Sequence, residues 1–219
     1  MIIDMHVHTS QLSSCSKLSP DDAILGAKQK GLDGICFMEH DVLWDRGKIS
    51  NLRDQFDFWV YSGLEVTTNY GHILVYGLDH WDKNGYVYRG FAPYFPLKEL
   101  KKIVERSGAY MVATHPFREP GYLQEGYGSC RLTVDPEDVL NRPVFHIVEA
   151  LEGFNGQSSP EENMLSFLVA QALGLPAVGA SDAHSRKEVG DGATVFSRNF
   201  SQEADFLWML KNGCFRLRE

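Results

Sequence analysis

The histidines and acidic residues of this chain recur directly after short apolar runs. His6 and His8 follow the first run, and Asp182 and His184 follow a late one. Four more runs end in residues of the same kinds, at Glu39 with His40, Glu65, His115 and Glu152. Active sites of parallel α/β folds lie at the carboxyl ends of the strands, so we expect these side chains to converge.

The spacing of two of these pairs favours metal binding. Side chains repeat every two residues on one side of an extended strand, so His6 and His8 share a side. Asp182 and His184 have the same spacing. Imidazole together with carboxylate suits Zn, Mn or Fe, whereas Mg prefers oxygen ligands. The sequence therefore predicts a cluster of divalent metal ions.

Apolar runs alternate with amphipathic segments along the chain. Strands are expected at 1–7, 34–38, 58–64, 72–78, 109–113, 144–151, 176–179 and 214–217. Helices are expected at 19–31, 97–108, 160–173 and 201–212, the first with Ser19 as N-cap and Pro20 in the first turn. This alternation predicts an α/β fold with a mainly parallel sheet, which a barrel satisfies as well as an open sheet.

Composition narrows the class of protein. The 219 residues suit one domain, 1–219, and 29 acidic against 21 basic residues give a formal charge of −8. An acidic chain is a poor non-specific binder of nucleic acid or anionic membranes. The sequence has no apolar run of membrane-spanning length and no signal-peptide pattern at its N-terminus. The four cysteines form no CxxC pair, so we expect a reducing, cytoplasmic location.

The ordered motifs resemble those of the PHP (polymerase and histidinol phosphatase) family. They read DMHVHT from residue 4, EHD from 39, GLEV from 63, GHIL from 71, THPF from 114 and GASDAH from 179. The resemblance extends from Asp4 to about Val195. It implies a distorted (βα)7 TIM-like barrel with a trinuclear metal site at the C-terminal ends of the strands.

The resemblance also implies a ligand set. A first ion would be held by His6, His8, Glu65 and Asp182, a second by His40 and His184, and a third by Glu65, His72 and His115. Glu152 and Asn155 match a further family-like segment and are expected beside the ligands.

The chain departs from the family pattern after His8. The family usually carries an Asp or His a few residues on, as a further ligand of the second ion, but residues 9–16 contain neither. Ser14 or Cys15 falls near the expected place. The second site is then weaker, completed by water, or filled by a cysteine thiolate.

The expected activity is metal-dependent hydrolysis of a phosphate ester, by a hydroxide that bridges two ions. The substrate would be a small-molecule or nucleotide phosphomonoester, with phosphate as a product. Asp41 and His184 are candidate proton donors, and Arg118, Arg131 and Arg186 are candidate clamps for the phosphoryl oxygens. A metal-dependent amidohydrolase, a nuclease-type phosphodiesterase and a non-catalytic metal-binding domain remain alternatives. The sequence does not indicate an oligomeric state.

Overall fold

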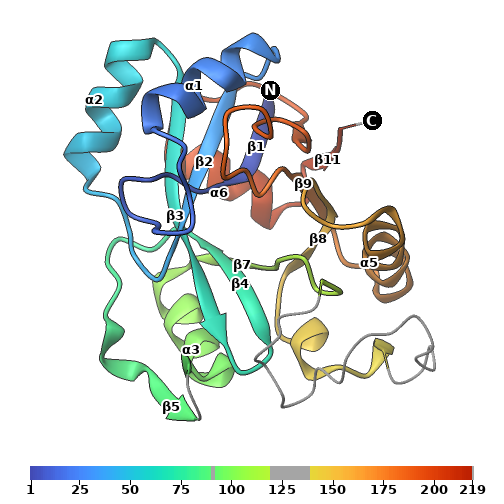
Figure 1. Cartoon of the computed structure of the whole chain (residues 1–219). Helices are drawn as coiled ribbons and strands as arrows, with labels where there is room; N and C mark the ends of the chain where they lie inside the picture. The colour runs from blue at the N-terminus through green and yellow to red at the C-terminus, as the bar shows by residue number, and fades with distance from the viewer. Residues whose placement is uncertain (90–91, 119–138, 219) are drawn as a thin grey trace.

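A nine-stranded mixed sheet organises the molecule (Figure 1). The computed structural model describes residues 1–89, 92–118 and 139–218. The sheet order is β11-β10-β1-β2-β3-β4-β7-β8-β9. Its strands are β1 (Ile2–Val7), β2 (Gly34–His40), β3 (Trp59–Thr68), β4 (Gly71–Tyr76), β7 (Tyr110–Ala113), β8 (Ala150–Asn155), β9 (Ala177–Ala180), β10 (Thr194–Phe196) and β11 (Phe215–Leu217). A separate hairpin pairs β5 (Val87–Arg89) with β6 (Ala92–Tyr94).

The two ends of this sheet approach each other and nearly close it into a barrel. Val7, at the end of β1, forms a parallel bridge with Ala183, just beyond β9. The amide of His8 donates to the carbonyl of Ala183 at 2.9 Å. The amide of Ser181 donates to the carboxylate of Asp4 at 2.9 Å. The first and last metal-type motifs of the sequence therefore lie side by side.

The barrel-like α/β architecture expected from the sequence is confirmed, whereas a count of seven βα units is not. Pairs β1–β2, β2–β3, β7–β8 and β8–β9 are parallel. In contrast, β3–β4 is an antiparallel hairpin and β4–β7 is also antiparallel. A hairpin needs no crossover helix, so the regular alternation of strand and helix is interrupted at this point.

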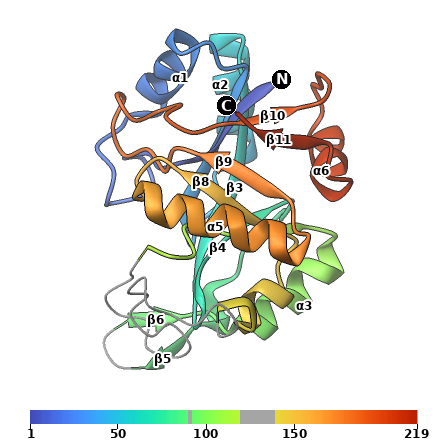
Figure 2. The same cartoon turned by 90° about the vertical axis from the view of Figure 1, so that its right-hand side faces the viewer.

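Five α-helices are found in the described ranges. They are α1 (Pro20–Gln29), α2 (Arg46–Phe56), α3 (Leu97–Ser107), α5 (Pro160–Leu173) and α6 (Glu203–Lys211). Ser19 caps α1 by accepting from the amide of Asp22, and Pro20 occupies its first turn, as the sequence predicts. Figure 2 shows α5 lying along β8 and β9. Helix α6 packs elsewhere on the sheet, where its residues Phe206 and Met209 share a hydrophobic cluster with Met5 of β1 and Tyr76 of β4.

The predicted elements differ from the structure in several places, and the hairpin of β5 and β6 was also not predicted. The segment expected as a strand at 144–151 starts as the short 3-10 helix η2 (Pro143–His146), and the strand begins only at Ala150. Pro143 lacks an amide hydrogen and suits a first helical turn, which explains the helix. Helix α2 and strand β10 were not predicted. A second 3-10 turn, η1 (Lys83–Gly85), precedes β5.

Among the described residues, no helix combines the length and the hydropathy needed to cross a membrane.

Candidate metal centre

The cluster is built around the two histidines that end β1. The Nε2 atoms of His6 and His8 lie 2.9 Å apart. Both nitrogens also face the carboxylate of Asp182, at 3.5 and 3.4 Å. All three side chains are buried, with at most 1% of each residue exposed. The predicted pairing of the first and last motifs is therefore present in the fold.

Glu65 lies at the centre of the cluster. Its Oε2 is 3.1 Å from His8 Nε2, 3.2 Å from His40 Nδ1 and 3.4 Å from His6 Nε2. Its Oε1 is 2.7 Å from His72 Nδ1 and 3.1 Å from His115 Nε2. Within the described residues, Oε2 has no partner in hydrogen-bonding geometry. One carboxylate thus faces imidazoles on both of its oxygens, as a ligand bridging two cations would.

Three residues at the strand ends have left-handed backbone conformations. The φ angles are 56° at Asp41, 30° at His115 and 54° at Asp182. Such angles are uncommon outside glycine and cost of order 1–3 kcal/mol each. Three of the four non-glycine residues with positive φ in the described part of the chain are therefore at this site. Backbone strain is concentrated where the candidate ligands leave their strands.

A surrounding layer of hydrogen bonds orients the ligands. Glu152 Oε1 lies 2.9 Å from His6 Nδ1 and accepts its proton, which turns Nε2 toward the cluster. Glu152 Oε2 accepts from the amide of His115 at 2.7 Å and from Asn155 Nδ2 at 2.8 Å. The hydroxyl of Thr114 donates to the same oxygen at 2.5 Å. Glu152 and Asn155 therefore lie beside the ligands, as expected from the sequence.

The carboxylates control the protonation of the central histidines. Burial opposes the charge on His6, but Asp182, Glu65 and Glu152 raise its pKa well above 6.5. The pKa of His8 is raised in the same way, against burial, by Asp182 and Glu65. Without metal, protons on these two imidazoles balance the buried negative charge.

The outer histidines are held neutral. Burial lowers the pKa of His40 to about 4, although Glu65 opposes the shift. Burial also lowers the pKa of His115 and of His184. Each of these rings is therefore neutral near neutral pH and has one nitrogen without a proton, as a metal ligand needs.

The donor set fits divalent metal ions. Three groups have ligand atoms that all lie within 4.8 Å of one another: His6, His8 and Asp182; His40, Glu65 and His72; and His8, Cys15 and His40. Six of the eight predicted ligands belong to these three groups. A seventh, His115, contacts the cluster through Glu65. His184 adjoins it, with its ring centroid 4.6 Å from that of His8. Imidazole and carboxylate donors match Zn, Mn or Fe.

The predicted substrate clamps have different surroundings. Arg118 reaches the cluster, with Nη1 2.7 Å from Asp182 Oδ2 and 3.4 Å from Asn155 Oδ1. Arg186 instead pairs with Asp22 of α1 at 3.0 Å. Arg131 lies outside the described residues.

The two predicted proton donors lie at the rim of the cluster. The Asp41 carboxylate accepts from the hydroxyl of Tyr86 and from the amide of Thr67. His184 Nδ1 lies 2.8 Å from the backbone carbonyl of Asp182, so that carbonyl accepts its proton. Both side chains are partly buried. Their roles as proton donors stay predictions.

Two buried carboxylates have positioning roles that the motifs did not reveal. Asp4 accepts from the amides of Ser181 at 2.9 Å and Gly190 at 2.8 Å, so it ties β1 to the segment that carries Asp182. Burial raises the pKa of Asp4 to about 6. Glu39 accepts from Trp44 Nε1 at 2.9 Å and from the loop that follows His8. Their presence in the motifs DMHVHT and EHD was the only signal in the sequence.

The sequence was compared with protein-family models and with curated proteins. Residues 160–214 match a family model described as PHP-associated. No curated protein matches the chain in sequence.

Several solved structures share the fold. A two-domain protein from Bacteroides vulgatus, described as containing a predicted PHP-like metal-dependent phosphoesterase, matches 100% of this chain and 64% of its own at 21% identity and a TM-score of 0.68. The chain therefore spans less than two thirds of that protein. An amidohydrolase from Chromobacterium violaceum with bound sulfate matches 95% of this chain and 96% of its own, at 14% identity and a TM-score of 0.66.

A third similar structure is a lesion-specific endonuclease from Pyrococcus furiosus. It matches 99% of this chain and 58% of its own, at 14% identity and a TM-score of 0.57. At these identities the likeness describes the fold. The family-model match covers only residues 160–214, and together with the shared fold it agrees with the resemblance of the sequence motifs to the PHP family.

Proposed function

We propose that this chain is a metal-dependent phosphoesterase that hydrolyses a small-molecule phosphomonoester. The observation that carries the proposal is the position of Glu65, whose two oxygens face five imidazole nitrogens at 2.7–3.4 Å. A carboxylate in such surroundings suits a site for more than one divalent ion. Ions bound there would supply a deprotonated water and would polarise a phosphoryl group.

The residues of the chain have separate tasks in this proposal. His6, His8, Glu65 and Asp182 would hold the ions, and Glu152 keeps the His6 ring in its binding orientation through Nδ1. Arg118 is placed to bind a phosphoryl oxygen, because its guanidinium already lies against Asp182 at the edge of the cluster and is 31% exposed. A guanidinium matches the geometry of phosphate oxygens.

A residue at the rim of the cluster would transfer a proton to the leaving group. His184 is 31% exposed, so it would take up a proton from solvent before it donates one, because burial lowers its pKa and leaves the ring neutral near pH 7. Asp41 is the second candidate, held by the hydroxyl of Tyr86. A proton donor must come within hydrogen-bonding reach of the leaving oxygen.

The charge of the chain favours a small substrate over nucleic acid. The formal charge is −8, and a nucleic-acid-binding surface gains most of its affinity from Lys and Arg contacts to phosphates. The endonuclease from Pyrococcus furiosus and the amidohydrolase from Chromobacterium violaceum share the fold, so a phosphodiester and an amide are the substrates to test against.

The test is hydrolysis by protein reconstituted with Zn or Mn, assayed on phosphomonoesters, a phosphodiester, single-stranded DNA and an amide. We expect phosphate release from phosphomonoesters to exceed turnover of the other classes. Arg118→Ala should raise KM for the phosphomonoester, while Arg216→Ala, an exposed arginine of β11, should leave it unchanged. Turnover of only the diester or only the amide would contradict the proposal.

A further inference from the structure

The loop that follows His8 is fixed over the metal centre on both sides of Cys15. Before it, the Ser13 hydroxyl donates to Glu39 Oε2 at 2.5 Å and lies 3.4 Å from His8 Nδ1. After it, the Ser16 hydroxyl donates to the carbonyl of His8 at 2.9 Å. Glu39 is completely buried and also accepts from the amide and hydroxyl of Thr9. The backbone on both sides of Cys15 is therefore held by hydrogen bonds, and the Cys15 side chain itself is exposed.

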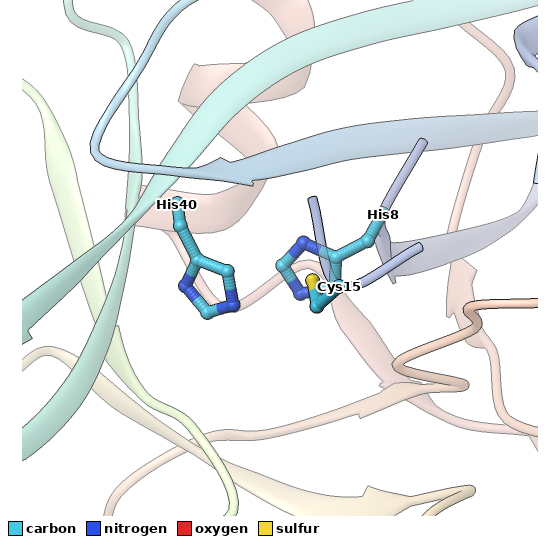
Figure 3. A group of neighbouring side chains, drawn as sticks. All are labelled: His8, Cys15 and His40. Atoms are coloured by element: carbon cyan, nitrogen blue, oxygen red, sulfur yellow. The ribbon is translucent and has the colours of Figure 1, made fainter. Parts of the chain in front are cut away.

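The thiol of Cys15 lies among the candidate ligands. Its sulfur and one ring nitrogen each of His8 and His40 are all within 4.8 Å of one another. Figure 3 shows the His8 and His40 rings side by side with the sulfur next to the His8 ring. The rings of His8 and His40 are stacked, with centroids 4.6 Å apart. These three residues come from the end of β1, the loop after it and the end of β2.

We propose that Cys15 is a thiolate ligand of a metal ion shared with His40, and that it makes this position selective for zinc or ferrous iron over manganese and magnesium. The third protein ligand is a nitrogen of His8 or of His184, whose rings are 4.6 Å apart. Three protein ligands leave a coordination position open for water or substrate, as in catalytic zinc sites. The inference rests on the proposed function, because it adds a ligand to the same centre.

The selectivity follows from the chemistry of the donor. Soft thiolate ligands favour Zn and Fe, whereas carboxylate, carbonyl and water favour Mg and Mn. The thiol releases its proton to solvent when the metal–sulfur bond forms, so no oxidant or reductant is needed.

The other described cysteines are placed differently. Cys36 is completely buried in the core of β2. Cys214 precedes β11, and its sulfur lies 3.6 Å from the backbone carbonyl of Asn212. Cys214 is therefore a suitable control, because its replacement changes a cysteine without reaching the cluster.

The test is X-ray absorption at the zinc edge on the full chain reconstituted with zinc. The wild type and Cys214→Ser should show a sulfur neighbour of zinc at about 2.3 Å. Cys15→Ser and Cys15→Asp should lose it. Cys15→Ser should also hold one equivalent of zinc less than the wild type. In competition between zinc and manganese, Cys15→Asp should bind a lower ratio of zinc to manganese than the wild type.

The outcomes separate this inference from the proposed function. Two or more bound zinc ions without a sulfur neighbour in the wild type, or a sulfur signal that survives in both Cys15 variants, would overturn the assignment of Cys15. A sulfur neighbour that depends on Cys15, in a protein that cleaves no phosphate ester, would keep the assignment and overturn the phosphoesterase. Cys15→Asp provides a second variant should Cys15→Ser fail to fold.

Discussion

Each buried carboxylate of the cluster needs a compensating positive charge. Glu65 and Asp182 stay ionised because the surrounding histidines, against the effect of burial, hold their pKa values well below the ordinary range. In the metal-free protein this compensation comes from protons on His6 and His8. A divalent ion supplies the same charge and displaces those protons. Protonation and metal binding therefore compete at the same nitrogens.

This competition predicts different pH responses of the metal-free and the metal-loaded protein. The pKa of His6 is raised on folding, so its contribution to stability is complete below pH 6.5 and is lost as the pH rises through the folded value. The free energy of unfolding of the metal-free protein should therefore fall as the pH rises above about 6.5 and through the raised pKa of His6. The zinc-loaded protein should not show this fall, because the proton is already displaced. Urea denaturation of both forms measures the difference.

Two histidine variants check the origin of that pH response. His6→Gln removes the titrating ring and should flatten the fall in the metal-free protein. His146→Gln changes an exposed histidine of η2 and should leave the fall intact. An equal response in both variants would show that His6 is not the group responsible.

Asp182 should be indispensable for metal binding. It is buried and faces His6, His8 and Arg118. Asp182→Ala should lower metal affinity and activity together by at least about a hundredfold, since loss even of residues that only orient ligands costs 10- to 100-fold. Metal analysis and turnover of the purified variant provide the measurement. Asp54→Ala, an exposed position on α2, is the matched control, and full activity of Asp182→Ala without bound metal would refute this role.

The clustering of the candidate ligands could be expected because their spacing and their places after apolar runs carry the signal, whereas their assignment to individual ions was implied by the resemblance and stays a prediction. In the pairs that begin at His6 and at Asp182, the two residues are two positions apart, so an extended strand places both side chains on the same side. The positioning carboxylates could not be predicted in the same way. Asp4 acts through amides of residues 181 and 190, and the sequence alone does not show that these segments meet.

At the scale of elements, the position of Asp182 depends on the contact between β9 and the segment before β10. A Cβ atom at Gly192 would lie 2.1 Å from the carbonyl oxygen of Ala180, which is backbone and cannot rotate away. Gly192→Ala should therefore displace the end of β9 and destabilise the protein by about 1–3 kcal/mol.

Denaturant unfolding and metal content together test this effect. The variant should lose metal affinity as well as stability, because β9 leads directly into Asp182. Ala204→Gly in α6, which costs about 1 kcal/mol through helix propensity alone, is a control that should keep its metal. A Gly192→Ala protein of unchanged stability would show that the close approach is not limiting.

Element predictions succeeded where local signals were strong. The N-cap of α1 and the apolar strands β1 and β2 follow from short-range patterns. Helix α2 was not predicted because most of its residues are polar and only Ile49 is buried. The antiparallel β3–β4 hairpin also interrupts the alternation from which a seven-unit barrel was expected. Strand direction depends on tertiary contacts that a single sequence does not display.

At the scale of the whole molecule, the metal centre joins segments that are far apart in sequence. His8 from the first strand and Asp182 from beyond β9 can share an ion only when the barrel closes. Bound metal therefore stabilises the closed fold and not the unfolded chain. An ion present at a hundred times its dissociation constant contributes about 2.7 kcal/mol.

Removal of metal should consequently lower thermal stability. For a chain of this size, that contribution corresponds to about 5–11 °C in the unfolding midpoint. Scanning calorimetry before and after chelation measures the shift, and added zinc should reverse it. An unchanged midpoint after complete removal of bound metal would show that the ions do not link the ends of the sheet.

The most direct test of the central claim is to measure metal content per chain and phosphate release from phosphomonoesters on the same sample. The sample is protein purified without chelator. The account predicts two or three divalent ions per chain, with phosphate release that is lost on chelation and restored by Zn or Mn. No bound metal after reconstitution, or phosphate release that persists in metal-free protein, would contradict it.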